Sequence, residues 1–399
     1  MRFSTSCTLL ITWHQQTGRM EHMQTIYMDY AAATPLDDQV KAAMEPYFAD
    51  RFYNPSALYL ASKSVAKDAE TARAHIANLL GARPTEIIFT AGGTEANNLA
   101  VQGVMQHYPE ANCIVSAIEH ESVLEPANRY DRRVAPVKPD GRLDLEALEK
   151  LIDNKTVLVS IMYANNEIGT IEPIKEVSQL LAKKRVQRTD LPLYLHTDAC
   201  QAANYLDLHV AVLGVDLMTL NGGKLYGPKQ SGALYVKTGT RLTPQILGGG
   251  QERGLRSGTE NMAHIVGFAA ALTRAQAIRH DEAERLLLLR QQFLAQLTTA
   301  MPKTVINGSV NHRLPNNIHV TFPGRDNERL LMELDELGIM CATGSACTAS
   351  NGVPSHVLKA IGLDDSEAQA SLRFTLGRGT TENDIAVAAK TLAELTRQK

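Results

Sequence analysis

A lysine follows a glycine pair at the end of an apolar run. Lys224 comes directly after Gly222 and Gly223, and residues 212–220 predict a buried strand. An ammonium group at the end of a central strand is costly unless its amine takes part in chemistry. The glycines leave room for a ligand beside the backbone. The pattern indicates an amine in a cleft that can form a Schiff base with a carbonyl cofactor; a lysine in an exposed turn is the alternative for this stretch alone.

A second glycine pair precedes a predicted helix. Residues 86–90 predict a strand, and Gly92, Gly93 and Thr94 then open the helix. The free N–H groups and the positive end of a helix attract phosphate, and a threonine hydroxyl adds a donor. The turn therefore predicts a phosphate site at Gly93 and Thr94, with a plain helix cap as the alternative.

Three more polar residues closely follow runs that predict strands, namely His120, Asn166 and Asp198. Ligand sites of α/β folds lie at the carboxyl ends of strands. A histidine there can stack on a ring or move protons. An aspartate can hold a proton on a pyridine nitrogen, which makes the ring a better electron sink. Together with Lys224 and the turn at Gly93, these residues predict a pyridoxal phosphate site.

The last third of the chain adds a thiol and a guanidinium. Cys347 lies in the small-residue stretch 344–352, and Arg373 lies within a strand expected at residues 371–376. A thiol on such a loop is a candidate nucleophile, although an incidental loop cysteine is the alternative. An arginine within a strand needs an anion, and its planar fork suits a carboxylate.

The elements that must position these residues form two groups. Strands alternate with helices between residues 86 and 220, which indicates a largely parallel sheet with helices on both faces. After the glycines at 248–250 the pattern is helical over residues 260–297 and then mixes strands with helices. A chain of 399 residues exceeds what one core usually supports, so we expect a second, smaller α+β domain.

Composition excludes several classes of protein. The net charge is −3 without a long basic run, which argues against direct nucleic-acid or membrane-surface binding. The five cysteines have neither disulfide-framework nor metal-site spacing, so we expect no metal and a reducing, cytoplasmic setting. No apolar run is long enough for a transmembrane helix. Residues 1–25 lack the patterning of the rest and are expected to be a disordered extension.

In this order, the motifs resemble those of cysteine desulfurases of the NifS/IscS family. The matching stretches are YMDYAA (27–32), TAGGTEANN (90–98), EHESVL (119–124), NNEIGT (165–170), HTDACQA (196–202), KLYGPK (224–229), GGGQERGLRSGTEN (248–261), GSACTAS (344–350) and LRFTLGR (372–378). The resemblance covers all of the chain except its N-terminal extension.

The resemblance implies the aspartate-aminotransferase-like fold of pyridoxal-phosphate-dependent transferases, fold type I. That fold has a mostly parallel, seven-stranded type of sheet with helices on both faces, plus a smaller α+β domain. The implied divisions are a segment at 26–36 that packs with the small domain, a large cofactor-binding domain at 37–262, and a small domain at 263–399 that carries the Cys347 loop.

The family's residue roles carry over to this chain as follows. By resemblance, Lys224 holds the cofactor as a Schiff base, and Gly93 and Thr94 hold its phosphate, which Thr259 reaches from the other subunit of a homodimer. The resemblance also implies that His120 stacks on the cofactor ring and takes part in catalysis, that Asp198 pairs with the pyridine nitrogen, and that Asn166 and Gln201 contact the ring oxygen. It further implies that Arg373 and Asn166 bind the substrate and that Cys347 accepts the sulfur.

The implied activity is the removal of sulfur from L-cysteine, which gives L-alanine and a persulfide on Cys347 for transfer to acceptor proteins of iron–sulfur cluster assembly or thio-modification. The chain departs from the family where Asn221 and Gly223 replace the usual Ser and His before Lys224. A lost charge-assisted contact of this kind is worth about 1.5–3 kcal/mol. The alternatives are a selenocysteine lyase or another β-eliminase, and a weakly active scaffold of a sulfur pathway.

Overall fold

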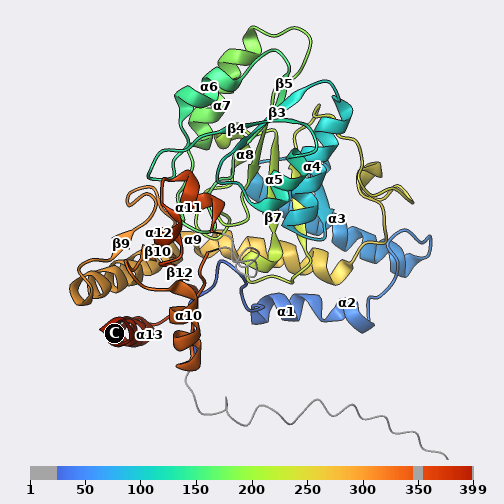
Figure 1. Cartoon of the computed structure of the whole chain (residues 1–399). Helices are drawn as coiled ribbons and strands as arrows, with labels where there is room; N and C mark the ends of the chain where they lie inside the picture. Colours follow the sequence, from blue (N-terminus) through green and yellow to red (C-terminus); the bar gives the residue numbers. More distant parts are fainter. Residues whose placement is uncertain (1–24, 345–353, 398–399) are drawn as a thin grey trace, which may run out of the picture.

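The computed structural model describes residues 25–344 and 354–397, and its centre is a seven-stranded sheet (Figure 1). In spatial order the strands are β2 (Ile87–Thr90), β8 (Gly232–Val236), β7 (Leu217–Asn221), β6 (Tyr194–Asp198), β5 (Thr156–Ser160), β3 (Asn112–Ser116) and β4 (Asp131–Ala135). The five strands from β7 to β4 pair in parallel, whereas β8 is antiparallel to both of its neighbours. The expected mostly parallel sheet is therefore confirmed.

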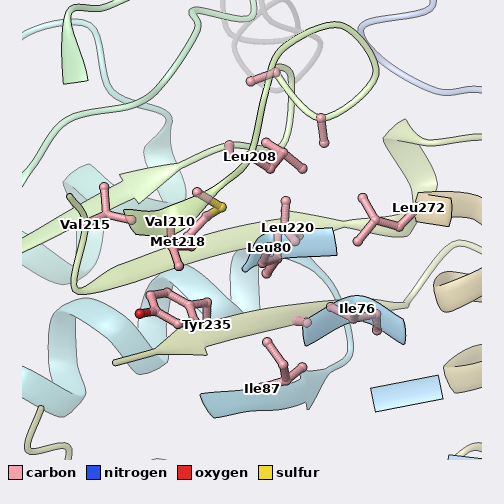
Figure 2. Close-up of a cluster of buried hydrophobic side chains, with 14 of the residues drawn as sticks. Ile76, Leu80, Ile87, Leu208, Val210, Val215, Met218, Leu220, Tyr235 and Leu272 are labelled. Atoms are coloured by element: carbon pink, nitrogen blue, oxygen red, sulfur yellow. The ribbon is translucent and has the colours of Figure 1, made fainter. Parts of the chain in front are cut away.

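Helices cover both faces of this sheet. The helices that precede its strands or alternate with them are α1 (Asp38–Met44), α2 (Pro46–Ala49), α3 (Leu60–Leu80), α4 (Gly93–His107), α5 (Glu121–Ala127), α6 (Leu145–Leu151), α7 (Ile174–Val186) and α8 (Val210–Leu213), with 3₁₀ turns at η1 (Pro84–Glu86), η2 (Gly222–Lys224) and η3 (Glu252–Gly254). Successive strand residues point to opposite faces. Ile87 and Met218 pack with α3 on one face (Figure 2), and their neighbours Ile88 and Leu217 pack with α4 on the other.

The strand expected over residues 212–220 was wrong in its first half. Residues Val210–Leu213 form the short helix α8, which Gly214 ends in the left-handed conformation with φ of 71°. The strand β7 begins only at Leu217. An apolar run buried on all sides has no periodicity that separates a helix from a strand, and a glycine that ends a helix divides this run.

The second part of the chain is built on the long helix α9 (Met262–Ala300). Residues 262–275 of α9 pack in the core of the large sheet, and residues 286–297 pack against a three-stranded antiparallel sheet. That sheet contains β9 (Val305–Ile306), β10 (Asn317–Thr321) and β12 (Ser371–Thr375), and the helices α10 (Asn327–Glu336), α11 (His356–Ala360), α12 (Asp365–Ala368) and α13 (Glu382–Arg397) accompany it. The boundary at 262/263 stays a prediction, because α9 begins there and packs with both parts.

The N-terminal segment connects these two parts. Strand β1 (Ile26–Tyr27) pairs in parallel with β11 (Ile339–Met340), and Ile26 and Met28 belong to the core of the second part. A few residues later the backbone N–H of Thr34 donates to the carbonyl of Gly223 beside Lys224. Within the described residues, no helix is long and apolar enough to cross a membrane, and no group of His, Cys, Asp and Glu could hold a metal ion.

Candidate active site

A cavity of about 180 Å³ lies at the carboxyl ends of strands β2, β3, β5, β6 and β7. Of the residues named from the sequence, it is lined by Gly93, Thr94, His120, Asn166, Asp198, Gln201, Asn221, Lys224 and Arg373. These residues are spread over 280 positions of the chain. All of them except Arg373 meet because parallel strands of the large sheet end at the same edge, where α/β proteins bind ligands.

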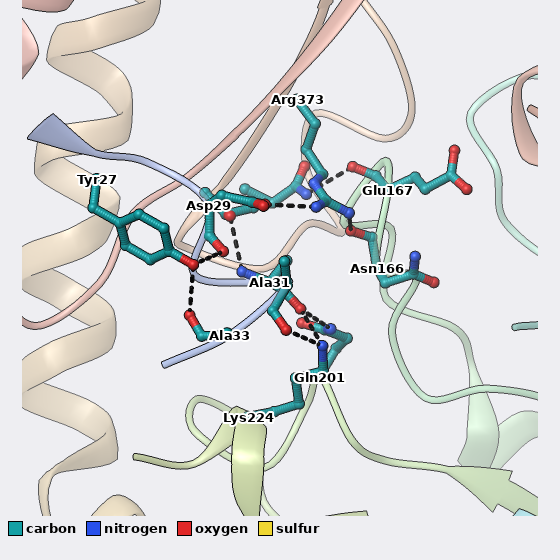
Figure 3. Close-up of polar contacts among 12 residues, drawn as sticks. Tyr27, Asp29, Ala31, Ala33, Asn166, Glu167, Gln201, Lys224 and Arg373 are labelled. Atoms are coloured by element: carbon teal, nitrogen blue, oxygen red, sulfur yellow. Dashed lines mark hydrogen bonds and ion pairs between the residues drawn. The ribbon is translucent and has the colours of Figure 1, made fainter. Parts of the chain in front are cut away.

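Lys224 ends the 3₁₀ turn that follows β7. The side chain of Asn221 begins this turn by accepting the N–H of Gly223 at 3.0 Å. The ammonium Nζ of Lys224 donates to the carbonyls of Ala31 and Ala32 at 2.7 and 2.6 Å, and Gln201 also donates to the Ala31 carbonyl (Figure 3). The amine is therefore held in the cavity by backbone carbonyls of the N-terminal segment.

The start of α4 forms another part of the cavity wall. Gly92 precedes the helix with φ of 133°, a conformation that side chains rarely adopt. A Cβ on Gly93 would lie 2.8 Å from the Sγ of Cys200, so only glycine fits there. Thr94 lies in the first turn, where helix N–H groups have no partner within the helix. This is the arrangement that a phosphate requires.

Asp198 and His120 face the cavity from β6 and from the start of α5. The Oδ1 of Asp198 accepts the N–H of Cys200 at 2.9 Å, and its Oδ2 accepts the amide of Asn97 at 2.7 Å. His120 caps α5, because its Nδ1 accepts the N–H of Ser122 at 3.0 Å. Both side chains are therefore held in place by hydrogen bonds from backbone N–H groups.

Arg373 approaches from the second part of the chain, as the expected strand placed it, and its side chain is only 2 % exposed. Its Nη2 donates to Asp29 at 2.6 Å and its Nη1 to the carbonyl of Asn166 at 3.0 Å (Figure 3). On the neighbouring strand His319 lies directly opposite Arg373, and burial lowers the pKa of His319 to about 3. The guanidinium therefore has one anionic partner and an uncharged neighbour.

Buried ionisable groups lie behind the cavity. Burial, with the charges of Asp198 and Glu172 added, raises the pKa of Glu119 well above its usual range, although the N–H of Met162 donates to it. Burial lowers the pKa of His196 to about 4, and its ring lies between the hydroxyls of Ser160 and Thr219. Burial therefore disfavours the charged forms of both Glu119 and His196, which lie close enough to Asp198 to interact with its charge.

Comparison with known proteins agrees with this geometry. The family model for class-V aminotransferases matches residues 26–387. The chain belongs to this family. Relatives of this chain include proteins named cysteine desulfurase IscS. One from Dictyoglomus turgidum is 42% identical over 90% of this chain and 91% of its own length. One from Clostridium botulinum strain Hall is 40% identical over 94% of this chain and 95% of its own.

Solved structures of NifS-like proteins share the fold of this class-V aminotransferase. One is 32% identical, with a TM-score of 0.87, and matches 94% of this chain and 100% of its own. Another, from Rickettsia africae, is 31% identical with a TM-score of 0.85, also over 94% of this chain and 100% of its own. These findings confirm the resemblance to the NifS/IscS group and the expected fold.

Two described residues named from the sequence, Gly223 and Thr259, do not line this cavity. Gly223 lies beside it, and a Cβ at this position would make ordinary van der Waals contacts, the nearest at 3.5 Å. Thr259 lies in a separate hollow with Arg256 and His264. Cys347 falls outside the described residues. The roles expected of all the residues named from the sequence stay predictions.

The residues present fit the pyridoxal phosphate on which class-V aminotransferases depend. The missing Cβ of Gly93 and the first turn of α4 suit its phosphate, the Asp198 carboxylate suits its pyridine nitrogen, and the Lys224 amine suits its carbonyl. Sequence reasoning missed two contributors, Asn97 and the segment 29–32. Both lie inside quoted motifs, but their partners are far away in sequence, so only the folded chain reveals their contacts.

Proposed function

We propose the residue roles by which this chain acts as a cysteine desulfurase, which takes sulfur from L-cysteine and releases L-alanine. The observation that carries the proposal is the meeting of Lys224, Asp198, His120 and the Gly93 turn around one cavity with Arg373 at its side. An aldehyde cofactor needs an amine, an acid, a ring-stacking group and a phosphate site together. Separate helix caps and turns would have no reason to converge.

The cofactor is held by residues of the large sheet. Gly93 and Thr94 take its phosphate, Asp198 its ring nitrogen, His120 its ring face, and Lys224 its carbonyl carbon. Further contacts come from residues beside the ring and in the lysine turn, namely Asn166, Gln201, Asn221 and Gly223. When bound, pyridoxal phosphate supplies an electron sink for the bonds at the substrate Cα.

Arg373 binds the substrate carboxylate. Asp29 and the carbonyl of Asn166 fix the plane of its guanidinium, so the fork is oriented before the substrate arrives. Lys224, once released from the cofactor by the substrate amine, moves the proton at Cα. Hydrogen bonds to the carbonyls of Ala31 and Ala32 hold the amine of Lys224 at the wall of the cavity.

The sulfur leaves as a persulfide on Cys347. Its thiolate attacks the substrate sulfur, and a new S–S bond forms as the Cβ–S bond breaks. The electron pair of the broken bond passes to the carbon side, which takes up a proton and becomes the methyl group of alanine. The persulfide then passes to acceptor proteins of iron–sulfur cluster assembly or thio-modification. We place this reaction in the cytoplasm, in a homodimer in which Thr259 reaches the partner's phosphate.

Two substitutions test these roles. Cys347→Ser should keep the absorbance of the bound cofactor but abolish sulfide release from L-cysteine, while Cys341→Ser, a matched control outside the cavity, should keep both. Lys224→Ala should remove the absorbance of the lysine-bound cofactor. Sulfide release at the wild-type rate by Cys347→Ser would disprove the proposed acceptor. Turnover of L-selenocysteine in the same assay distinguishes a selenocysteine lyase.

A further inference from the structure

Asn97 lines the cavity and connects two of its walls. It belongs to α4 and is only 1 % exposed. Its Nδ2 lies 2.7 Å from the Oδ2 of Asp198 and 2.8 Å from the Oγ of Ser122. One buried amide therefore contacts both the acid of β6 and the first turn of α5, which His120 caps.

The direction of these hydrogen bonds follows from the acceptors. A carboxylate only accepts, so the NH₂ group of Asn97 must face Asp198. Turning the amide over would place its oxygen against the Asp198 oxygen. Both N–H bonds of Asn97 are then used, by Asp198 and by the Ser122 hydroxyl. The Oδ1 of Asn97 is buried and has no partner among the described residues, which shows that donation to Asp198 and Ser122 takes precedence.

The same reasoning assigns the proton of His120. The N–H of Ser122 can only donate, and it points at Nδ1 of His120 from 3.0 Å. Nδ1 is therefore an acceptor, and the neutral ring carries its proton on Nε2. The Oγ of Ser122 is 2.8 Å from Nδ1, and because it accepts from Asn97, its own proton is available to the imidazole. A chain of donors runs from Asn97 through Ser122 to His120.

We propose that Asn97 is a positioning residue that orients Asp198 and His120 together. The inference rests on the proposed function, in which both residues contact the cofactor ring. The carboxylate is held from two sides, by Asn97 and by the N–H of Cys200, and the imidazole is held as its Nε2–H form. The amide of Asn97 therefore fixes the position of Asp198, at the ring nitrogen, relative to that of His120, on the ring face.

The first arm of the test uses the cofactor-free protein with ¹⁵N-labelled histidine. The His120 resonances, assigned by their loss in His120→Gln, should show the Nε2–H tautomer. In Asn97→Leu the Ser122 hydroxyl no longer accepts a hydrogen bond from Asn97, so its own hydrogen bond to Nδ1 of His120 should weaken. The Nδ1 resonance should therefore move toward the value of a nitrogen that accepts no hydrogen bond. Asn98→Leu is the matched control, since Asn98 is half-buried and donates to the carbonyl of Thr94 in its own helix.

The second arm titrates these proteins with pyridoxal phosphate. Asn97→Leu should weaken binding about ten- to a hundredfold, the usual value of a hydrogen bond to a charged group. The pH midpoint of the bound-cofactor absorbance should also rise. Without the Asn97 amide the Asp198 carboxylate has one hydrogen-bond donor fewer, so it attracts the proton on the ring nitrogen more strongly. The ring then carries less positive charge. Ser122→Ala removes only the branch to His120 and should change affinity less than about threefold. A role in stability alone would lower Tm without moving the midpoint.

The two arms separate the failure of this inference from that of the proposed function. An Nδ1–H tautomer in the wild-type protein, or an unchanged Nδ1 resonance in Asn97→Leu, would overturn the donor chain. An unchanged pH midpoint in Asn97→Leu would overturn its link to Asp198. If the wild-type protein bound no pyridoxal phosphate, the proposed function would fail and the positioning role with it, while the resonances would still decide whether the donor chain exists.

Discussion

At the scale of single residues, the turn before Lys224 departs from its family. Gly223 occupies a position with ordinary contacts only, the nearest being Oδ1 of Asn221 and Cγ of Lys229 at 3.5 Å. Its φ is not among the positive values of the chain, so a side chain would bring no backbone strain there. The turn is instead shaped by Asn221, whose side chain accepts the Gly223 N–H. The glycine is therefore not required by the local fold.

Gly223→His should strengthen binding of pyridoxal phosphate. An imidazolium at this position would add a charge-assisted contact of about 1.5–3 kcal/mol with the phosphate, which the resemblance assigns to this position. Fluorescence titration of the cofactor-free protein would measure the gain, and Gly223→Ala would control for the added bulk. An affinity that is equal in both variants would contradict the expected contact.

At the scale of elements, the site depends on how closely α4 approaches the loop after β6. The helix begins at Gly93, and its first residue faces the thiol of Cys200, which burial and Asp198 keep protonated by raising its pKa well above the usual range. The cradle of the helix start is thus shaped by a contact between two elements that are more than 100 residues apart. Packing at this contact sets the space available to the phosphate.

Gly93→Ala should weaken cofactor binding, because its Cβ would lie 2.8 Å from Cys200 Sγ. Overpacking of this kind costs about 1–3 kcal/mol. Cys200→Ala removes the obstructing sulfur, so the double variant should recover part of the lost affinity. Equilibrium titrations of the two single variants and the double variant form a complete cycle. Equal losses with and without the sulfur would show that the methyl group blocks the phosphate itself.

At the scale of the whole molecule, buried acids make stability depend on pH. Burial raises the pKa of Glu172 from 4.5 to about 8, and its Oε2 accepts the N–H of Leu143 at 2.8 Å. Between these pH values the folded protein holds a proton that the unfolded chain releases. The contribution of Glu172 to the free energy of unfolding therefore falls as pH rises from about 4.5 to about 8.

Glu172→Gln should flatten this slope, because an amide keeps the hydrogen bond and cannot titrate. The difference between the two proteins should reach up to about 1.4 kcal/mol per pH unit, the value for one proton. Urea unfolding at several pH values between 5 and 8 measures it. Glu176→Gln, an exposed carboxylate four residues later, should leave the slope as it is. Parallel curves for the wild-type protein and Glu172→Gln would contradict the assignment.

The proposed homodimer makes a separate prediction at this scale. Thr259 and Lys224 line different hollows of one chain, so the resemblance pairs Thr259 with the partner's cofactor. Mixed dimers of Lys224→Ala and Thr259→Ala subunits should then contain one fully wild-type site. Their sulfide release per dimer should be about half that of the wild-type protein and above that of a pure Thr259→Ala dimer. No gain on mixing would argue that Thr259 acts within its own subunit.

The sequence by itself determined the parts of this protein that are local. The turn at Gly93, the turn at Lys224 and the polar ends of β3, β5 and β6 are short motifs, and parallel strands bring such ends together at one edge. The strand that carries Arg373 was also readable, because a charged residue in an apolar run needs a partner. These motifs were sufficient for the fold class, and most of the residues that they named line one cavity.

Only the tertiary structure decided which distant groups complete the site. The antiparallel strand β8, the helix α8 inside an expected strand, the pairing of Arg373 with Asp29 across 344 positions, and the amide of Asn97 between β6 and α5 have no local signal. Hydrogen bonds between distant segments depend on the path of the backbone, which hydrophobic packing sets. A sequence motif therefore identifies a functional side chain, whereas the tertiary structure determines which distant residue it contacts.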